Sequence, residues 1–150
     1  MFEDSIPVGI VTATDIVREI YRFGRAFDFS GAYSKEVFQE GPKVEVEQII
    51  RLMDKHRIGS VLISEGRMPH AIFTERDLLR AVLSPDFRFQ AKVGDFATEK
   101  VVTADEGIDG LEAAAIMASH HIKRLPLTRS GEIVGIVTAR DLVDGFAGSL

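Results

Sequence analysis

The apolar positions of this chain follow two alternating periods. Short apolar, β-rich runs predict strands, and between them apolar residues recur at the three- and four-residue spacing of a helix. Residues 37–39 and 101–103 predict a first strand, 60–63 and 124–127 a second, and the segments ending at Thr74 and Thr138 a third. The helical stripes are Val46, Ile49, Ile50 and Met53; Leu111, Ala114, Ala115 and Ala118; Leu78, Leu79 and Val82; and Leu142, Val143 and Phe146. The predicted order, β-α-β-β-α, therefore occurs twice.

A Thr-x-x-Asp turn ends the third strand in each of these units, and the same turn occurs once more near the N-terminus. The three copies end at Asp15, Asp77 and Asp141, so their spacing along the sequence is nearly equal. Regular spacing of this kind is typical of repeated supersecondary units that bury their faces against one another. Asp77 and Asp141 are 64 residues apart (141 − 77), and this separation is the repeat offset that relates equivalent positions of the two complete copies.

The first copy lacks its front half. Residues 1–22 supply only a third strand (Val8 to Val11) and a last helix with Ile16, Val17 and Ile20 on its apolar face. We expect either a fragment of a longer repeat or a half-repeat that packs on a partner chain. The predicted organisation is a truncated repeat over 1–22, a connector over 23–34, a complete repeat over 35–84, a connector over 85–91 and a complete repeat over 92–148.

Composition and charge exclude or disfavour several classes of function. The chain is 45% hydrophobic and 27% charged, which is typical of a folded domain, and its net charge of −5 opposes nucleic-acid binding. The absence of cysteine excludes disulfides, zinc–thiolate sites and a cysteine nucleophile. No apolar run approaches the roughly 18 residues of a membrane helix, and no secretory signal is evident. A cytoplasmic location is expected.

The Gly-Ile-Val-Thr-x-x-Asp turn, the Ile122-Lys-Arg-Leu-Pro126 strand and the period of about 60 residues closely resemble the CBS domain, named for cystathionine β-synthase. The resemblance implies an α/β (α+β) fold in which tandem β-α-β-β-α repeats pack as a pseudo-twofold Bateman module. It also implies a regulatory role and an adenosine-containing ligand, namely AMP, ADP, ATP or S-adenosylmethionine, in clefts between the repeats. No metal is required.

The chemistry of the third turn fits such a ligand. Unpaired N–H groups and partial positive charge at a helix start suit a phosphate. The Asp141 carboxylate can accept from the two hydroxyls of a ribose, Thr138 can add a contact and Arg140 can reach a phosphate. Gly135 would let a flat base approach the strand. A helix cap, which needs no ligand, is the alternative, although capping boxes prefer Glu or Gln to the shorter Asp.

The two complete copies differ at positions that matter for a ligand. The third copy has Pro126 and Gly135, whereas the second has Leu62 and Ala71, which predicts a weaker or empty second site. His121 is expected to be a helix-end residue or a phosphate contact rather than a metal ligand. The predicted ligand-binding residues are Thr138, Asp141, Arg140, Gly135, Thr103, Ile122, Arg124, Pro126, Thr74, Asp77, Arg76 and His121, with Thr12 and Asp15 as a weaker set.

No catalytic motif is present, so we expect a protein that is not an enzyme. The leading hypothesis is an adenosyl-ligand sensor that dimerises through its helical faces and controls an unidentified protein. The alternatives are a ligand-free interaction or assembly module whose aspartates are only caps, and nucleic-acid binding through the basic residues near the turns.

Overall fold

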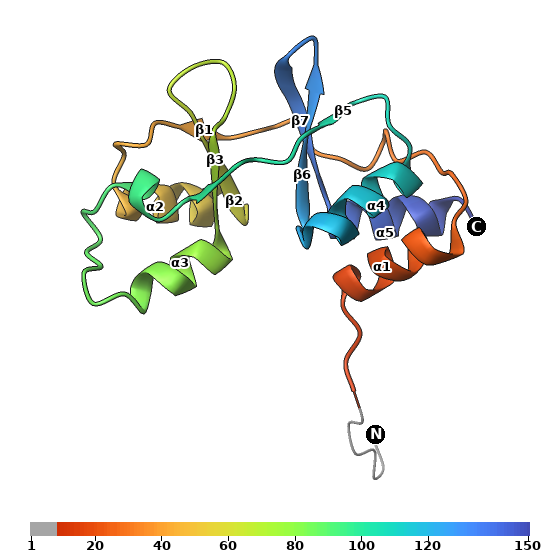
Figure 1. Ribbon diagram of the computed structural model, residues 1–150, viewed down its shortest axis with the longest axis horizontal. Coiled ribbons are helices and arrows are strands. Elements are labelled where there is room, and N and C mark those ends of the chain that lie inside the picture. Colours follow the sequence, from red (N-terminus) through yellow and green to blue (C-terminus); the bar gives the residue numbers. More distant parts are fainter. Residues whose placement is uncertain (1–8) are drawn as a thin grey trace.

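The computed structural model describes residues 9–150, and the predicted strand residue Val8 lies outside this range. Two units of the same design lie side by side (Figure 1). Their predicted α+β fold, tandem β-α-β-β-α repeats, is confirmed. The first unit runs β1 (Gln39–Glu40), α2 (Val46–His56), β2 (Ser60–Ile63), β3 (Ala71–Thr74) and α3 (Glu75–Val82), and the second runs β5 (Ala104–Asp105), α4 (Gly110–His120), β6 (Arg124–Arg129), β7 (Glu132–Thr138) and α5 (Ala139–Gly148). The other elements are α1 (Ala13–Phe23), the 3₁₀-helix η1 (Val93–Asp95) and β4 (Thr98–Glu99).

The two sheets share one topology. In each, the first strand pairs parallel with the second, and the second pairs antiparallel with the third. Ser60 lies opposite Thr74 in one sheet and Arg124 lies opposite Thr138 in the other, so the repeat offset relates the two registers. The units therefore form a pseudo-twofold pair.

Each sheet is completed by the chain segment that leads into the other unit. Thr98 of β4 pairs with Ile72 on the outer edge of β3, and Ser34 pairs with Ile136 on the outer edge of β7. The repeat offset also relates these two pairs. Backbone donors that would otherwise lie unpaired at the edges are thus satisfied, and the two units are interlocked.

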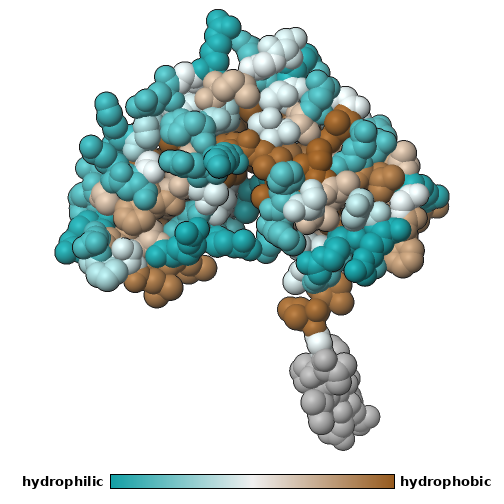
Figure 2. Space-filling model, viewed as in Figure 1, coloured by the Kyte–Doolittle hydropathy of each residue, from teal (hydrophilic) through white to brown (hydrophobic). Residues whose placement is uncertain are grey.

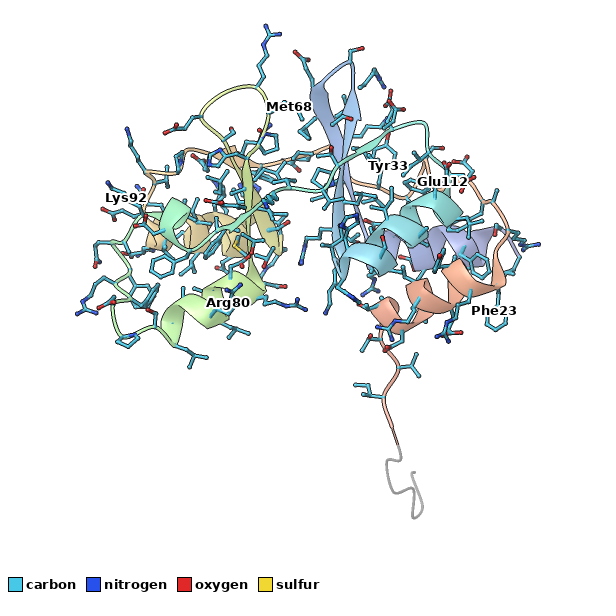
Figure 3. All side chains as sticks on the ribbon, viewed as in Figure 1. Phe23, Tyr33, Met68, Arg80, Lys92 and Glu112 are labelled. Atoms are coloured by element: carbon cyan, nitrogen blue, oxygen red, sulfur yellow. The ribbon has the colours of Figure 1, made fainter. Side chains whose placement is uncertain are left out.

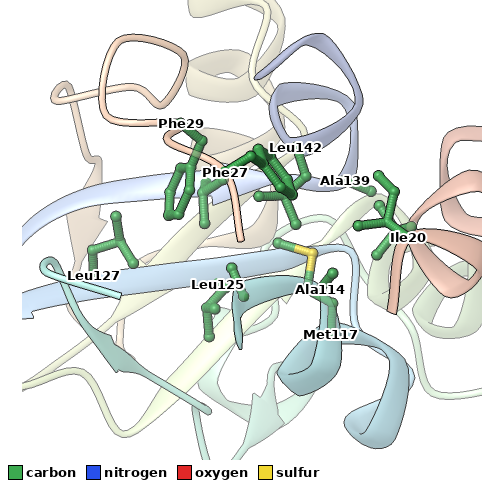
Figure 4. Packing of buried hydrophobic residues seen from close by; sticks show 12 residues of the cluster. Ile20, Phe27, Phe29, Ala114, Met117, Leu125, Leu127, Ala139 and Leu142 are labelled. Carbon is green, nitrogen blue, oxygen red and sulfur yellow. The ribbon is translucent and has the colours of Figure 1, made fainter. Parts of the chain in front are cut away.

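Helix α1 packs on the second unit only. It contacts α4 and α5, and Val17 and Ile20 enter the core of that unit. Phe27 and Phe29 of the following connector are buried in the same cluster, around Leu125, Leu127 and Leu142 (Figure 4). The first unit has a separate core, and no helix within residues 9–150 packs on it as α1 packs on the second.

Three predicted strands differ from the observed ones. Strands β1 and β5 begin later than the predicted 37–39 and 101–103, because pairing with the parallel neighbour starts only at Gln39, opposite Leu62, and at Ala104, opposite Leu127. Residues 9–11, predicted as the third strand of the truncated copy, form no strand. The described chain places no second strand of that copy beside them, so their backbone has no ladder to join.

The buried faces of two helices differ in part from the prediction. In α4 the buried residues are Gly110, Ala113, Ala114 and Met117, so Ala114 is predicted correctly, whereas the predicted Leu111, Ala115 and Ala118 are only partly buried. In α3 the predicted core residues Leu79 and Val82 are 68% and 52% exposed. Ala81 is buried instead, and the predicted Leu78 is partly buried against the core of the first unit.

Ile20 provides a test of the role of α1. Its side chain is 4% exposed inside the second core, so Ile20→Ala should lower the free energy of unfolding by about 2–5 kcal/mol in urea titrations. The matched control is Ile10→Ala at a residue that is 87% exposed, which should change it by less than about 0.5 kcal/mol. Equal effects of the two changes would show that α1 does not belong to the core.

Candidate functional site

Two clefts lie between the units. The first, called here the Asp77 cleft, has a volume of about 390 Å³ and is lined by Ile72, Thr74, Glu75, Arg76, Asp77, Leu79 and Thr98 together with His121, Ile122, Lys123 and Arg124. The second, called the Thr138 cleft, has a volume of about 260 Å³ and is lined by Ser34, Glu36, Val37, Phe38, Arg57, Ile58, Gly59, Ser60 and Leu62 together with Arg124, Ile136 and Thr138. The repeat offset relates most of the two linings.

Each cleft has walls from both units. The turn of one unit faces the end of the first helix and the start of the second strand of the other. His121 and Ile122, which the sequence grouped with the turn of their own copy, therefore line the cleft of the other turn. The corresponding residues of the Thr138 cleft are Arg57 and Ile58, which local motifs did not reveal. The repeat in the sequence could have revealed Arg57 and Ile58, because they precede His121 and Ile122 by the repeat offset.

The third turn forms a capping box at the start of α5. Asp141 Oδ2 accepts from the Thr138 backbone N–H at 2.8 Å and from the Thr138 hydroxyl at 2.8 Å, and the Asp141 N–H donates to Thr138 Oγ1 at 3.3 Å. The short Asp side chain therefore does reach back to the cap. Within residues 9–150, Asp141 Oδ1 has no hydrogen-bond donor. Asp141 itself does not line the Thr138 cleft, which its capping partner Thr138 lines.

The second turn forms the same box, but both oxygens of its carboxylate are engaged. Asp77 Oδ2 accepts from the backbone and hydroxyl of Thr74 at 2.9 and 2.6 Å. Asp77 Oδ1 accepts from the hydroxyl of Thr98 at 2.7 Å and lies 3.7 Å from Arg80 Nη1. The Asp77 residue is only 2% exposed, so this charge is buried among its partners.

The first turn is a cap on the exposed start of α1. Asp15 Oδ2 accepts from the backbone and hydroxyl of Thr12 at 2.9 and 2.6 Å. The Thr12 hydroxyl, followed by the Thr12 backbone N–H, lowers the pKa of the Asp15 carboxyl below its ordinary value. Neither residue lines the Thr138 cleft or the Asp77 cleft.

The residue three positions after each aspartate explains part of this difference. It is Arg18 in the first turn and Arg80 in the second, and each guanidinium lies 3.7 Å from Oδ1 of its aspartate. In the third turn the same position is Asp144, which pairs with Arg140 at 3.9 Å. An acidic residue cannot donate to Oδ1 of Asp141, so that oxygen has no cationic neighbour at this position of its own helix.

The remaining predicted site residues separate into two groups. Arg76 lines the Asp77 cleft, and Arg124 lines both clefts while its Nη2 lies 3.2 Å from Oε2 of Glu75. Three others, Arg140, Thr103 and Pro126, line neither cleft. The side chain of Arg140 is 86% exposed. Pro126 is instead buried in β6.

Gly135 leaves room for a protein side chain. A Cβ at this position would lie 2.5 Å from the ring of Tyr33 and 3.0 Å from the Ser34 carbonyl oxygen. The ring of Tyr33 (Figure 3) thus occupies the space that the sequence suggested for a base. The second copy has Ala97 at the position of Tyr33 and can therefore carry Ala71 at the position of Gly135.

Two other kinds of site are absent from residues 9–150. No three His, Asp or Glu side chains in this range are grouped so that they could hold a metal ion. Likewise, none of its helices combines the length and the apolar character needed to cross a membrane.

Comparison with known sequences identifies both units. A sequence profile of the CBS domain matches residues 34–84 and 93–148, together more than half of the chain. The chain is 34% identical over 115 residues to the uncharacterised protein MK0525 of Methanopyrus kandleri, covering 73% of this chain and 57% of that protein. It is 34% identical over 109 residues to inosine-5′-monophosphate dehydrogenase of Korarchaeum cryptofilum, covering 72% of this chain but 22% of the enzyme. The chain thus spans only part of both relatives.

Solved structures with the same fold include the CBS domain pair of protein MJ0100, crystallised with 5′-methylthioadenosine and S-adenosyl-L-methionine. The TM-score is 0.73 at 22% identity, over 84% of this chain and all of that one. Protein MJ1225 of Methanocaldococcus jannaschii, proposed as an archaeal homologue of γ-AMPK, aligns with a TM-score of 0.78 at 19% identity, over 91% of this chain and 54% of that one. These similarities show the fold.

The contact between Tyr33 and Gly135 can be tested by a double-mutant cycle. Gly135→Ala should lower the free energy of unfolding by about 1–3 kcal/mol, because the new methyl group overpacks against the ring. In a Tyr33→Ala background the same change should cost less than in the unaltered protein, because only the contact with the Ser34 carbonyl oxygen at 3.0 Å remains. Gly31→Ala is the control, since a Cβ there meets nothing within 4 Å. An equal cost of Gly135→Ala in both backgrounds, measured in urea, would contradict the contact.

Proposed function

This chain belongs to the CBS domain family, and we propose that it is a regulatory module that binds an adenosine-containing ligand in the Thr138 cleft. The ligand class is AMP, ADP, ATP or S-adenosylmethionine. The observation that carries the proposal is that Asp141 Oδ1 has no donor in the described chain. The capping box that holds this carboxylate at the start of α5 uses only Oδ2. A carboxylate fixed in this way presents one oxygen to a pair of adjacent hydroxyls, the feature that distinguishes a ribose.

The rest of the Thr138 cleft suits the other parts of such a ligand. Apolar side chains that can enclose a base come from both units and include Val37, Ile58 and Ile136. Arg57 and Arg124 supply positive charge for a phosphate, as does the start of α5. The volume of 260 Å³ is below the roughly 300–1,000 Å³ of pockets that enclose drug-sized ligands, so the cleft can enclose only part of such a ligand.

The relatives support the same ligand class. The CBS pair of MJ0100 was crystallised with two adenosyl compounds, and it covers 84% of this chain with the same fold. A ligand that prefers one packing of the two units would shift the population toward that packing, and a protein that contacts the module would respond to the shift. Regulation of this kind requires no catalysis by the module itself.

A second candidate function is assembly without a small-molecule ligand. It is favoured by the three turns, in each of which the aspartate accepts from the backbone and the hydroxyl of its threonine without a ligand. It is also favoured by Leu79, Val82 and Leu83, which are 68%, 52% and 84% exposed along α3. Figure 2 shows hydrophobic residues gathered on the surface over this helix. We propose that this apolar row, the α3 row, is the helical face through which two copies dimerise; it is compatible with either function.

The binding proposal is tested by calorimetric titration with AMP, ATP and S-adenosylmethionine. We expect at least one to bind at sub-millimolar concentration and Asp141→Ala to weaken it by about tenfold or more, since Oδ1 is lost. Asp15→Ala is the matched control, because it removes the same capping carboxylate from a turn that lines neither cleft. Each variant should lose about 1 kcal/mol of stability as a cap. Binding by none of the three, or unchanged affinity in Asp141→Ala, would leave the assembly function.

The dimer proposal is tested by sedimentation equilibrium. The double variant Leu79→Ser/Leu83→Ser removes two exposed leucines of the α3 row and should convert a dimer to a monomer without loss of helical content. Leu150→Ser is the control, because Leu150 is 85% exposed but lies outside the α3 row. A double variant that sediments like the unaltered protein would rule out this face.

A further inference from the structure

We infer that Thr98 acts as a latch that closes the Asp77 cleft to a ribose, and that this side chain makes the two clefts unequal. The inference rests on the proposed function, because it concerns a second binding site for the same class of ligand. Its starting point is the bond from the Thr98 hydroxyl to Asp77 Oδ1, at 2.7 Å. That oxygen corresponds to the oxygen of Asp141 that has no donor in the described chain.

The corresponding hydroxyl in the other unit has a different partner. Ser34 precedes Thr98 by the repeat offset, and its backbone pairs with β7 as that of Thr98 pairs with β3. However, the Ser34 hydroxyl donates to the Glu36 carbonyl at 3.1 Å and accepts from the Glu36 N–H at 3.2 Å. The Ser34 hydroxyl is therefore bonded to the backbone of its own segment and does not donate to Asp141 Oδ1.

The backbone after each hydroxyl residue explains the difference. Lys100 corresponds to Glu36 and has a left-handed φ of 64°, and its N–H donates to the His70 carbonyl at 3.1 Å. This N–H is consequently unavailable to the Thr98 hydroxyl, which turns to the carboxylate instead. A hydrogen bond to an ionised acceptor is roughly twice as strong as one between neutral groups, which favours this alternative.

The latch also separates two spaces. Asp77 and Thr98 line the Asp77 cleft and, on their other side, a hollow of about 450 Å³ that Arg80, Ser84 and Asp95 help to form. Their hydrogen bond thus lies in the wall between the cleft and the hollow. A ribose that binds to Asp77 must first displace the Thr98 hydroxyl, whereas a ribose at Asp141 displaces no described protein group. The Thr138 cleft should therefore fill first, with one ligand per chain.

The closing experiment compares Thr98→Val with unaltered protein by calorimetric titration with AMP. Valine keeps the branched shape but cannot donate, so the Asp77 cleft should gain about tenfold or more in affinity and the stoichiometry should rise from one to two. Ser34→Ala is the matched control, because its hydroxyl contacts only Glu36. It should not raise the stoichiometry. In an Asp141→Ala background, Thr98→Val should restore one bound ligand, which assigns the new site to the Asp77 cleft.

The two proposals fail in different measurements. Failure of the unaltered protein to bind overturns the proposed function, whereas failure of Thr98→Val to bind more tightly than the unaltered protein overturns the latch. Weaker binding in Thr98→Val would also overturn it, because Thr98 would then be a ligand contact. Thr98 lies in an exposed, short edge strand, and a thermal transition checks that the variant folds. Thr98→Ala repeats the test with a second side chain, and Thr98→Ser should remain latched.

Discussion

The pairing of each sheet edge with the segment entering the other unit is the constraint on which the rest of the structure depends. Ile72 and Ile136 lie on outer strands whose backbone groups would otherwise be exposed, and Thr98 and Ser34 satisfy them. Connector residues bond to the starts of the first helices in the same reciprocal way, Phe27 to Gly110 and Ala91 to Val46. These bonds bring the turn of each unit to face the helix end of its neighbour and so form both clefts.

Helix α1 breaks the symmetry that this interlocking creates. It closes the second core through Val17 and Ile20, whereas the first core is completed without such a helix. The outward row on α3 and the covered surface of α4 and α5 therefore belong to units that share one topology but present different faces. A module built from two similar repeats can in this way offer one face to a partner and keep the other for its own stability.

Much of the fold could be predicted from the sequence, because it is encoded in local periods and in one repeated turn. The order of elements and the repeat offset both follow from Thr-x-x-Asp and the apolar stripes. The composition of the clefts could not be predicted, because it depends on pairings such as Ser34 with Ile136, which are far apart in the sequence and have no local signature. Gly135 shows the same limit: the sequence reveals missing side-chain volume, but only the structure shows that Tyr33 fills it.

The three turns show that a motif can be identical while its chemistry is not. In every copy the box between Thr and Asp uses Oδ2, so the motif itself cannot distinguish a cap from a binding site. The distinction lies in what surrounds Oδ1: Arg18 in the first turn, Thr98 and Arg80 in the second, and no donor within the described chain in the third. Thr98 comes from β4, in the segment that leads into the second unit. We therefore propose that binding capacity in such repeats is decided by residues outside the motif, some of them supplied by the segment that joins the units.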